Sequence, residues 1–210
     1  MSNRGQFITF EGTEGVGKST QLANAASILK ALSIDYIVTR EPGGTPMAES
    51  IRELLLAPRA EPVNEITELL LMFAARAQHL HTRILPELEA GRWVLCDRFT
   101  DATFAYQGGG RGVPAERIAQ LENLVQGSVR PDHVILLDAP VETGMTRARH
   151  RGELDRFEQE AVAFFERIRQ TYLDRATGSP ARYHIVDASQ SLQAVSDEVS
   201  GLIRELADRA

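Results

Sequence analysis

The stretch that decides the fold is GTEGVGKS, residues 12–19, near the start of the 210-residue chain. It has the spacing G-x-x-x-x-G-K-[ST] of a loop that binds phosphate groups. The glycines of such a loop let successive backbone N–H groups converge on phosphate oxygens, and the helix that follows adds the positive end of its dipole. Lys18 would bind the terminal phosphates of a nucleotide, and the Ser19 hydroxyl would bind Mg²⁺. The loop therefore predicts a nucleotide site but not the reaction.

The residues on both sides of this loop have the order that it requires. Residues 6–11 (QFITFE) are β-prone, and apolar residues at helical spacing follow the loop as far as Leu32. Further β-prone runs lie at 35–39, 92–97, 132–138 and 183–186. Helical patterns lie between them at about 48–56, 65–89, 114–125, 141–149, 158–176 and 191–206, and the glycine-rich run 108–112 is expected to be a flexible loop. Strands that alternate with helices need crossover connections. We therefore expect an α/β P-loop NTPase fold, with a five-stranded parallel sheet flanked by helices.

Composition limits the class of protein. With 43% hydrophobic and 25% charged residues, the chain is expected to form one globular domain over residues 1–210. No apolar run approaches the ~20 residues of a membrane span, and no signal peptide is expected at the start. The single cysteine, Cys96, cannot form an internal disulfide, so we expect a cytoplasmic protein. A net charge of −6 argues against nucleic acid or an anionic membrane as a partner.

Two of the expected strands end in an aspartate, Asp97 and Asp138. Either carboxylate could lie at the carboxyl edge of the sheet, where ligands bind in folds of this kind. Asp97 is followed at once by Arg98, so a carboxylate that serves the metal and a cation that serves a phosphate would reach the site together. Asp138 could equally cap the helix that begins near Val141.

A basic segment at 147–158, RARHRGELDRFE, lies in a chain that is otherwise acidic. By itself it is typical of a solvated helix end, whose cations suit the helix dipole. Beside a phosphate-binding loop, its arginines could close over a transferred phosphoryl group and stabilise the charge that develops there. Gly152 could be the hinge of such a movement. We interpret the segment as a short arginine-rich lid.

The expected acceptor is a nucleoside monophosphate. A hydroxyl acceptor needs a base to take its proton, and the sequence contains no His-Arg-Asp catalytic loop. A phosphate acceptor is already ionised, since its second pKa is about 6. The difficulty is then repulsion between two polyanions, which arginines and Mg²⁺ reduce. Two alternatives stay open: a P-loop kinase for another small phosphorylated acceptor, and a nucleotide-dependent switch or motor module.

Longer motifs resemble the thymidylate kinase family over essentially the whole chain. They are EGTEGVGKST at 11–20, TREPGG at 39–44, FAAR at 73–76, DR at 97–98, AYQGGGRG at 105–112 and RHRGELDR at 149–156. The resemblance implies a homodimer that phosphorylates dTMP to dTDP with ATP and Mg²⁺, a step of dTTP synthesis. It also implies that the catalytic arginine is Arg151 in the lid, because the variable positions of the loop contain none.

The resemblance further implies contacts for single residues. Lys18, Asp97, Arg98 and Arg151 are the expected catalytic residues. The expected ATP contacts are Gly12, Thr13, Glu14, Gly15, Val16, Gly17, Lys18, Ser19, Thr20, Arg147 and Arg149. The expected dTMP contacts are Glu14, Arg52, Met72, Phe73, Arg76, Arg98, Thr103, Tyr106 and Gln107, and the expected Mg²⁺ ligands are Ser19 and Asp97.

Within the dTMP set, Arg52 and Arg98 are expected at the phosphate and Glu14 at the 3′-hydroxyl. Arg76 and Thr103 would bond the thymine edge, with Gln107 in the same pocket. The ring of Tyr106 would lie under the deoxyribose and crowd a 2′-hydroxyl. The sequence departs from the family pattern at Met72, since a phenylalanine that stacks on the base is usual there, and Phe73 is its neighbour.

Overall fold

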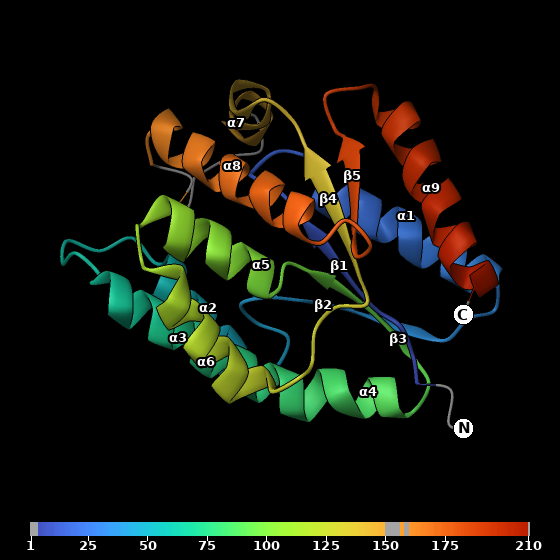
Figure 1. The fold of residues 1–210 in the computed structure, drawn as a ribbon, viewed down its shortest axis with the longest axis horizontal. Coiled ribbons are helices and arrows are strands. Elements are labelled where there is room, and N and C mark those ends of the chain that lie inside the picture. Colours follow the sequence, from blue (N-terminus) through green and yellow to red (C-terminus); the bar gives the residue numbers. More distant parts are fainter. Residues whose placement is uncertain (1–3, 150–155, 158–159, 210) are drawn as a thin grey trace.

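A central sheet of five parallel strands organises the computed structural model, which describes residues 4–149, 156–157 and 160–209 (Figure 1). The strand order is β2-β3-β1-β4-β5. The strands are β1 (Phe7–Glu11), β2 (Tyr36–Arg40), β3 (Trp93–Asp97), β4 (His133–Asp138) and β5 (Tyr183–Asp187). The predicted α/β fold with a five-stranded parallel sheet is confirmed.

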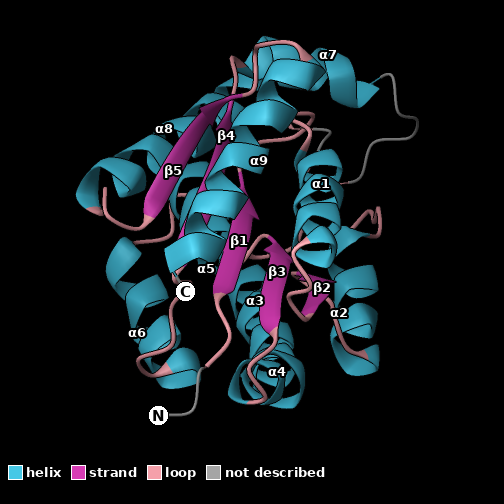
Figure 2. Ribbon diagram, turned by 90° about the vertical axis from the view of Figure 1, so that its right-hand side faces the viewer, coloured by secondary structure: helices cyan, strands magenta, loops and turns pink. Residues whose placement is uncertain are grey.

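Helices cover both faces of this sheet (Figure 2). They are α1 (Lys18–Ala31), α2 (Pro46–Leu56), α3 (Glu65–His79), α4 (Leu85–Glu89), α5 (Thr100–Thr103), α6 (Ala115–Gln126), α7 (Val141–Arg149), α8 (Val162–Gly178) and α9 (Leu192–Arg209). Two segments, η1 (Leu80–Ile84) and η2 (Phe104–Gly110), are π-helical. Among the described residues, none of the helices is long and apolar enough to cross a bilayer.

The three central strands, β1, β3 and β4, are almost entirely buried, as near-continuous apolar runs predict. In β1, Ile8 and Phe10 pack against apolar residues of α1 and α9, while Phe7 points the other way toward η1 and α4. In β4, Val134 and Leu136 pack against apolar residues of α8. Because the sheet is covered on both sides, its carboxyl edge is the place left for a ligand.

Local signals place the two helices that carry predicted substrate contacts. The Thr45 side chain accepts a hydrogen bond from Ala48 N at the start of α2, and Pro46 occupies its first turn. Asn64 caps α3 in the same way, accepting from the backbone N–H of Ile66. These caps fix where α2 and α3 begin, and so fix the positions of Arg52 and Arg76.

Two expectations about helices need correction. The predicted helix over 65–89 is present, but it consists of α3, η1 and α4 in succession. Pro86 cannot donate to a carbonyl in the preceding turn, and the chain widens to a π-helix just before it. The expected flexible loop at 108–112 was wrong, because Gly108–Gly110 are the last turn of η2.

Candidate active site

A cavity of about 440 Å³ lies at the carboxyl edge of the sheet. Its walls come from the loop after β1, the segment from β2 into α2, α3, the end of β3, and α5 with η2. The predicted site residues on its wall are Glu14, Gly15, Gly17, Lys18, Ser19, Thr20, Arg52, Met72, Arg76, Asp97, Arg98, Thr103, Tyr106, Gln107 and Arg147. The fold therefore brings most of the predicted nucleotide and substrate contacts to one cavity.

The phosphate-binding loop, residues 12–17, lies directly against α7. A Cβ atom on Gly15, whose φ is 69°, would lie 1.8 Å from the carbonyl oxygen of Gly144. Gly17 precedes α1 with a φ of 92°, no side chain caps α1, and its first turn contains no acidic residue. The N–H groups at this helix start are therefore available to an anion.

Lys18 folds back over the loop and is buried. Its ammonium Nζ donates to the carbonyl oxygens of Thr13 at 2.7 Å and Gly12 at 3.2 Å, and lies 4.0 Å from a Glu14 carboxylate oxygen. Burial, and next the positive charge of Arg98, lower the pKa of Lys18 to about 8. Val16 is packed in the core beside α1. The expected contacts of Gly12, Thr13 and Val16 with a nucleotide would therefore come from the backbone.

Arg98, the first residue after β3, is held by three oxygen atoms. Its guanidinium donates to the Gly12 carbonyl at 2.9 Å, to a Glu14 carboxylate oxygen at 2.7 Å and to the Tyr172 hydroxyl at 3.2 Å. It also lies over the Tyr106 ring, 4.8 Å from the centroid, and the Tyr106 hydroxyl donates to the same Glu14 oxygen at 2.7 Å. Arg98, Glu14 and Tyr106 thus form one cluster beside the phosphate-binding loop.

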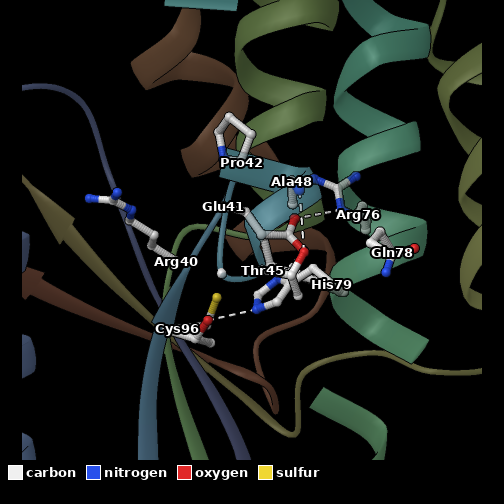
Figure 3. A network of polar contacts seen from close by, with 12 residues as sticks. Arg40, Glu41, Pro42, Thr45, Ala48, Arg76, Gln78, His79 and Cys96 are labelled. Carbon is white, nitrogen blue, oxygen red and sulfur yellow. Dashed lines mark hydrogen bonds and ion pairs between the residues drawn. The ribbon is translucent and has the colours of Figure 1, made fainter. Parts of the chain in front are cut away.

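Arg76, also on the cavity wall, is fixed by a buried polar network (Figure 3). Its Nε donates to Glu41 at 2.7 Å and its Nη2 to the Thr103 hydroxyl at 2.9 Å. The other Glu41 oxygen lies 3.0 Å from His79 Nδ1, and His79 Nε2 lies 2.6 Å from the Thr39 hydroxyl. The remaining nitrogen, Arg76 Nη1, is buried without a hydrogen-bond partner in the described part of the chain. The network therefore leaves one nitrogen of a cavity-lining arginine unpaired.

Met72 and Phe73 separate in the structure. Met72 lies on the cavity wall, whereas Phe73 packs in a core cluster with Leu69 and Ile118. The Arg76 guanidinium lies over the Phe73 ring, 4.8 Å from its centroid. Phe73 therefore supports Arg76 from behind and does not reach the cavity, unlike the contact expected from the sequence, because helical geometry turns adjacent residues to different sides.

The two candidate aspartates also differ in their partners. Asp138 accepts two hydrogen bonds of 2.8 Å from Arg169, one at each oxygen, which tie it to α8. Asp97 lies on the cavity wall with Ser19, and its Oδ1 is buried without a partner among the described residues. In that part of the chain no cluster of three or more His, Cys, Asp or Glu could hold a metal. One carboxylate plus substrate phosphates suits Mg²⁺.

Comparison with known proteins decides the family. The family model described as Thymidylate kinase matches residues 10–199. A thymidylate kinase of Pseudomonas putida is 58% identical over 98% of both chains, and one of Pseudomonas syringae pv. tomato is 59% identical over 96% of both. The crystal structure of thymidylate kinase from Ehrlichia chaffeensis is 33% identical, with a TM-score of 0.76 over 95% of this chain and 99% of its own. The chain belongs to the thymidylate kinase family. It is therefore a kinase, a phosphotransferase.

The predicted arginine-rich lid, residues 147–158, is described only at its two ends. Arg147 donates to the Ala188 carbonyl at 2.8 Å, next to the cavity. Arg149 is the last residue of α7, its side chain is not described, and Arg151 lies outside the described residues. At the other end, Phe157 lies on the cavity wall and packs edge-on to Tyr106, with ring centroids 5.9 Å apart.

Several residues of this thymidylate kinase-family site were not predicted from the sequence. Glu41 anchors Arg76, Tyr172 contacts Arg98, and Glu68 holds the Gln107 amide at 2.9 Å. Glu41 lies inside the quoted TREPGG motif, which was a usable signal. Glu68 and Tyr172 lie in helices with ordinary amphipathic patterns, so only the tertiary structure reveals them.

Proposed function

We propose that the chain transfers the γ-phosphoryl group of ATP to the phosphate of dTMP, giving dTDP. The observation that carries this proposal is a single cavity whose wall includes both the phosphate-binding loop and Arg76, with its unpaired Nη1. Two nucleotides bound from opposite ends would meet with their phosphates between Lys18 and Arg98. No proton acceptor is needed, because the acceptor phosphate is already ionised at neutral pH.

The proposed catalytic work of the described residues is electrostatic. Lys18 and the backbone of the loop would hold the donor phosphates, and Arg98, with Arg52 beside it, would hold the phosphate of dTMP. Arg52 is partly buried, and this burial lowers the pKa of its guanidinium. Cations held in place before the reaction stabilise charge that develops in the transition state without a cost of reorganisation.

We propose Ser19 and Asp97 as the protein ligands of Mg²⁺. The unpartnered Asp97 oxygen supports this assignment, since a buried carboxylate oxygen without a donor is costly unless a ligand pairs with it. When held by these two residues, Mg²⁺ would neutralise part of the negative charge of the phosphates.

For the nucleoside of dTMP, we propose Arg76, Thr103 and Gln107 at the thymine edge and Met72 against its ring. Tyr106 would lie under the deoxyribose and Glu14 near the 3′-hydroxyl. The hydrogen bond between Tyr106 and Glu14 supports a common sugar site, since it orients both side chains from two elements.

In the lid, Arg151 is the proposed catalytic arginine, and Arg147 and Arg149 are proposed near the adenine and its phosphates. Replacing Arg151 by alanine should lower kcat by ~10³ or more with little change in the KM for dTMP, because its charge acts mainly in the transition state. Arg204→Ala in α9 is the matched control. An equal fall in both variants would remove the assignment.

The decisive assay of the proposed function is ADP release with ATP, Mg²⁺ and a panel of dTMP, dUMP, dGMP, AMP and CMP. Turnover should be fastest with dTMP. Rapid turnover of another monophosphate with negligible turnover of dTMP would overturn the proposal.

We propose that the chain works in the cytoplasm as a homodimer. Leu70 on α3 and Leu124 on α6 are 51% and 80% exposed, and these helices pack side by side, which supports an apolar interface there. Sedimentation should give twice the 23.2 kDa chain mass, and Leu124→Glu should give the single chain.

A further inference from the structure

The base end of the cavity combines two groups of opposite hydrogen-bonding character. Arg76 can only donate: its Nε and Nη2 donate to Glu41 and Thr103, and its Nη1 has no hydrogen-bond partner in the described part of the chain. Gln107, one helical turn after Thr103, also lies on the wall and carries an amide that could turn either its NH₂ or its oxygen to a ligand.

Glu68 decides which way the Gln107 amide turns. This side chain of α3 is 1% exposed, and one oxygen accepts a hydrogen bond of 2.9 Å from Gln107 Nε2. The same oxygen lies 3.6 Å from Arg111 Nε, and the other oxygen is paired with Arg156. A carboxylate between two guanidinium groups only accepts hydrogen bonds, so the amide must point its NH₂ to Glu68. The Gln107 amide then has its carbonyl oxygen on the side away from Glu68, where it can accept a hydrogen bond from a ligand.

We infer that Glu68 is a positioning residue that makes the site select 4-oxopyrimidines over cytosine. The inference rests on the proposed function and deepens it. Beside a fixed donor on Arg76, Glu68 creates a fixed acceptor on Gln107. Thymine and uracil present the complementary edge, with an O4 acceptor and an N3–H donor. Cytosine presents the reverse pattern. Its amino donor would face the donor of Arg76, and its N3 acceptor would face the acceptor of Gln107.

Glu68→Gln removes the fixed acceptor without removing the side chain. The new amide keeps its oxygen for Arg156 and turns its NH₂ to Gln107, which then rotates and presents its own NH₂ to the cavity. We expect the ratio of kcat/KM for dTMP to that for dCMP to fall about tenfold or more, the usual effect of one mismatched base-edge contact. A ratio unchanged from the wild type would overturn the inference.

Exchanging the two side chains provides the rescue. In the double variant Glu68→Gln, Gln107→Glu, the carboxylate at position 107 accepts from the amide at position 68 and keeps its second oxygen as an acceptor for the base. We expect the preference for dTMP to return toward the wild-type ratio. If Glu68→Gln does not fold, the double variant is tested alone: a retained dTMP preference supports the inference, and its loss contradicts it.

Arg156→Gln is the matched control, because it removes the other partner of Glu68 and leaves the Gln107 contact in place. We expect it to change kcat/KM for dTMP and dCMP by the same factor. A ratio that falls as far as in Glu68→Gln would assign the effect to the Arg156 contact and overturn the inference.

The proposed function and the role of Glu68 can fail separately. A wild-type protein that is inactive on dTMP contradicts the proposed function. A wild-type protein that is active on dTMP, with an unchanged ratio in Glu68→Gln, contradicts only the role of Glu68.

Discussion

Arg98 has a backbone φ of 67°, in the left-handed region that residues other than glycine rarely adopt. Such a conformation costs of order 1–3 kcal/mol and persists only where the surroundings impose it. Here Glu11, fully buried, accepts from the next backbone N–H, that of Phe99, at 2.7 Å and from the Tyr172 hydroxyl at 2.8 Å. Tyr172 in turn accepts from Arg98. Glu11 thus holds the backbone and the guanidinium of the proposed phosphate-binding arginine.

Tyr172→Phe removes the hydroxyl that connects Glu11 to the Arg98 guanidinium. We expect the KM for dTMP to rise about tenfold, as for the loss of one hydrogen bond to a charged group, with a smaller effect on kcat. Steady-state kinetics with varied dTMP measures it, and Tyr36→Phe, at the start of β2, is the control. A KM unchanged in Tyr172→Phe would show that Arg98 keeps its position without this contact.

The lowered pKa of Lys18 predicts a pH dependence of nucleotide binding. Phosphates favour the charged ammonium, so binding requires proton uptake above pH 8. The affinity for ADP should be flat below that pH and weaken by up to about tenfold per pH unit above it. The same pKa shift affects the stability of the free protein. Below pH 8 Lys18 is charged although it is buried, and this lowers the free energy of unfolding. The destabilisation disappears as the pH rises from about 8 to the ordinary pKa of 10.5.

Calorimetric titration of ADP from about pH 6.5 to 9.5 measures this dependence. Lys18→Arg keeps the positive charge but does not titrate in that range, so its affinity should stay flat. An identical slope in both proteins would place the titrating group elsewhere.

Among the elements, α5 with η2 shows the limit of local patterns. Three consecutive glycines, Gly108–Gly110, predict flexibility, yet they form a helical turn packed against α8. A Cβ atom at Gly109 would lie 2.1 Å from the Thr171 hydroxyl, and one at Gly110 would lie 2.5 Å from the Phe164 ring. These two glycines are therefore explained by close packing between helices. Nothing local distinguishes that requirement from a flexible loop, because the two partners lie 62 and 54 residues further along the chain.

Gly110→Ala should therefore destabilise the protein. A methyl group there meets an aromatic ring that cannot move aside easily, and overpacking of this kind costs typically about 1–3 kcal/mol. Gly108→Ala is the matched control, since its Cβ would lie 3.3 Å from the flexible end of Ile118. Urea denaturation compares the free energies of unfolding. Equal stability of the two variants would contradict the packing explanation.

At the scale of the whole molecule, the sequence predicted the strand and helix order and the residues at the two ends of the cavity. Lys18 and Ser19 belong to a contiguous motif, and Arg98 follows directly from the end of a buried strand. The residues that hold these groups in place were not predictable, because Glu68 and Tyr172 act on partners that are 39 and 74 residues away. Motifs report groups that touch a ligand, whereas supporting contacts depend on how distant helices pack.

The central claim is that ATP and dTMP bind in one cavity with their phosphates facing each other. Adenosine and thymidine joined through a chain of five phosphates test it directly by calorimetry, because linking two ligands raises affinity only when both sites are engaged together. One molecule of this linked compound should bind per chain, at least about a hundredfold more tightly than ADP or dTMP alone. Its binding should prevent both ADP and dTMP from binding. Binding no tighter than that of ADP, or two molecules per chain, would contradict the claim.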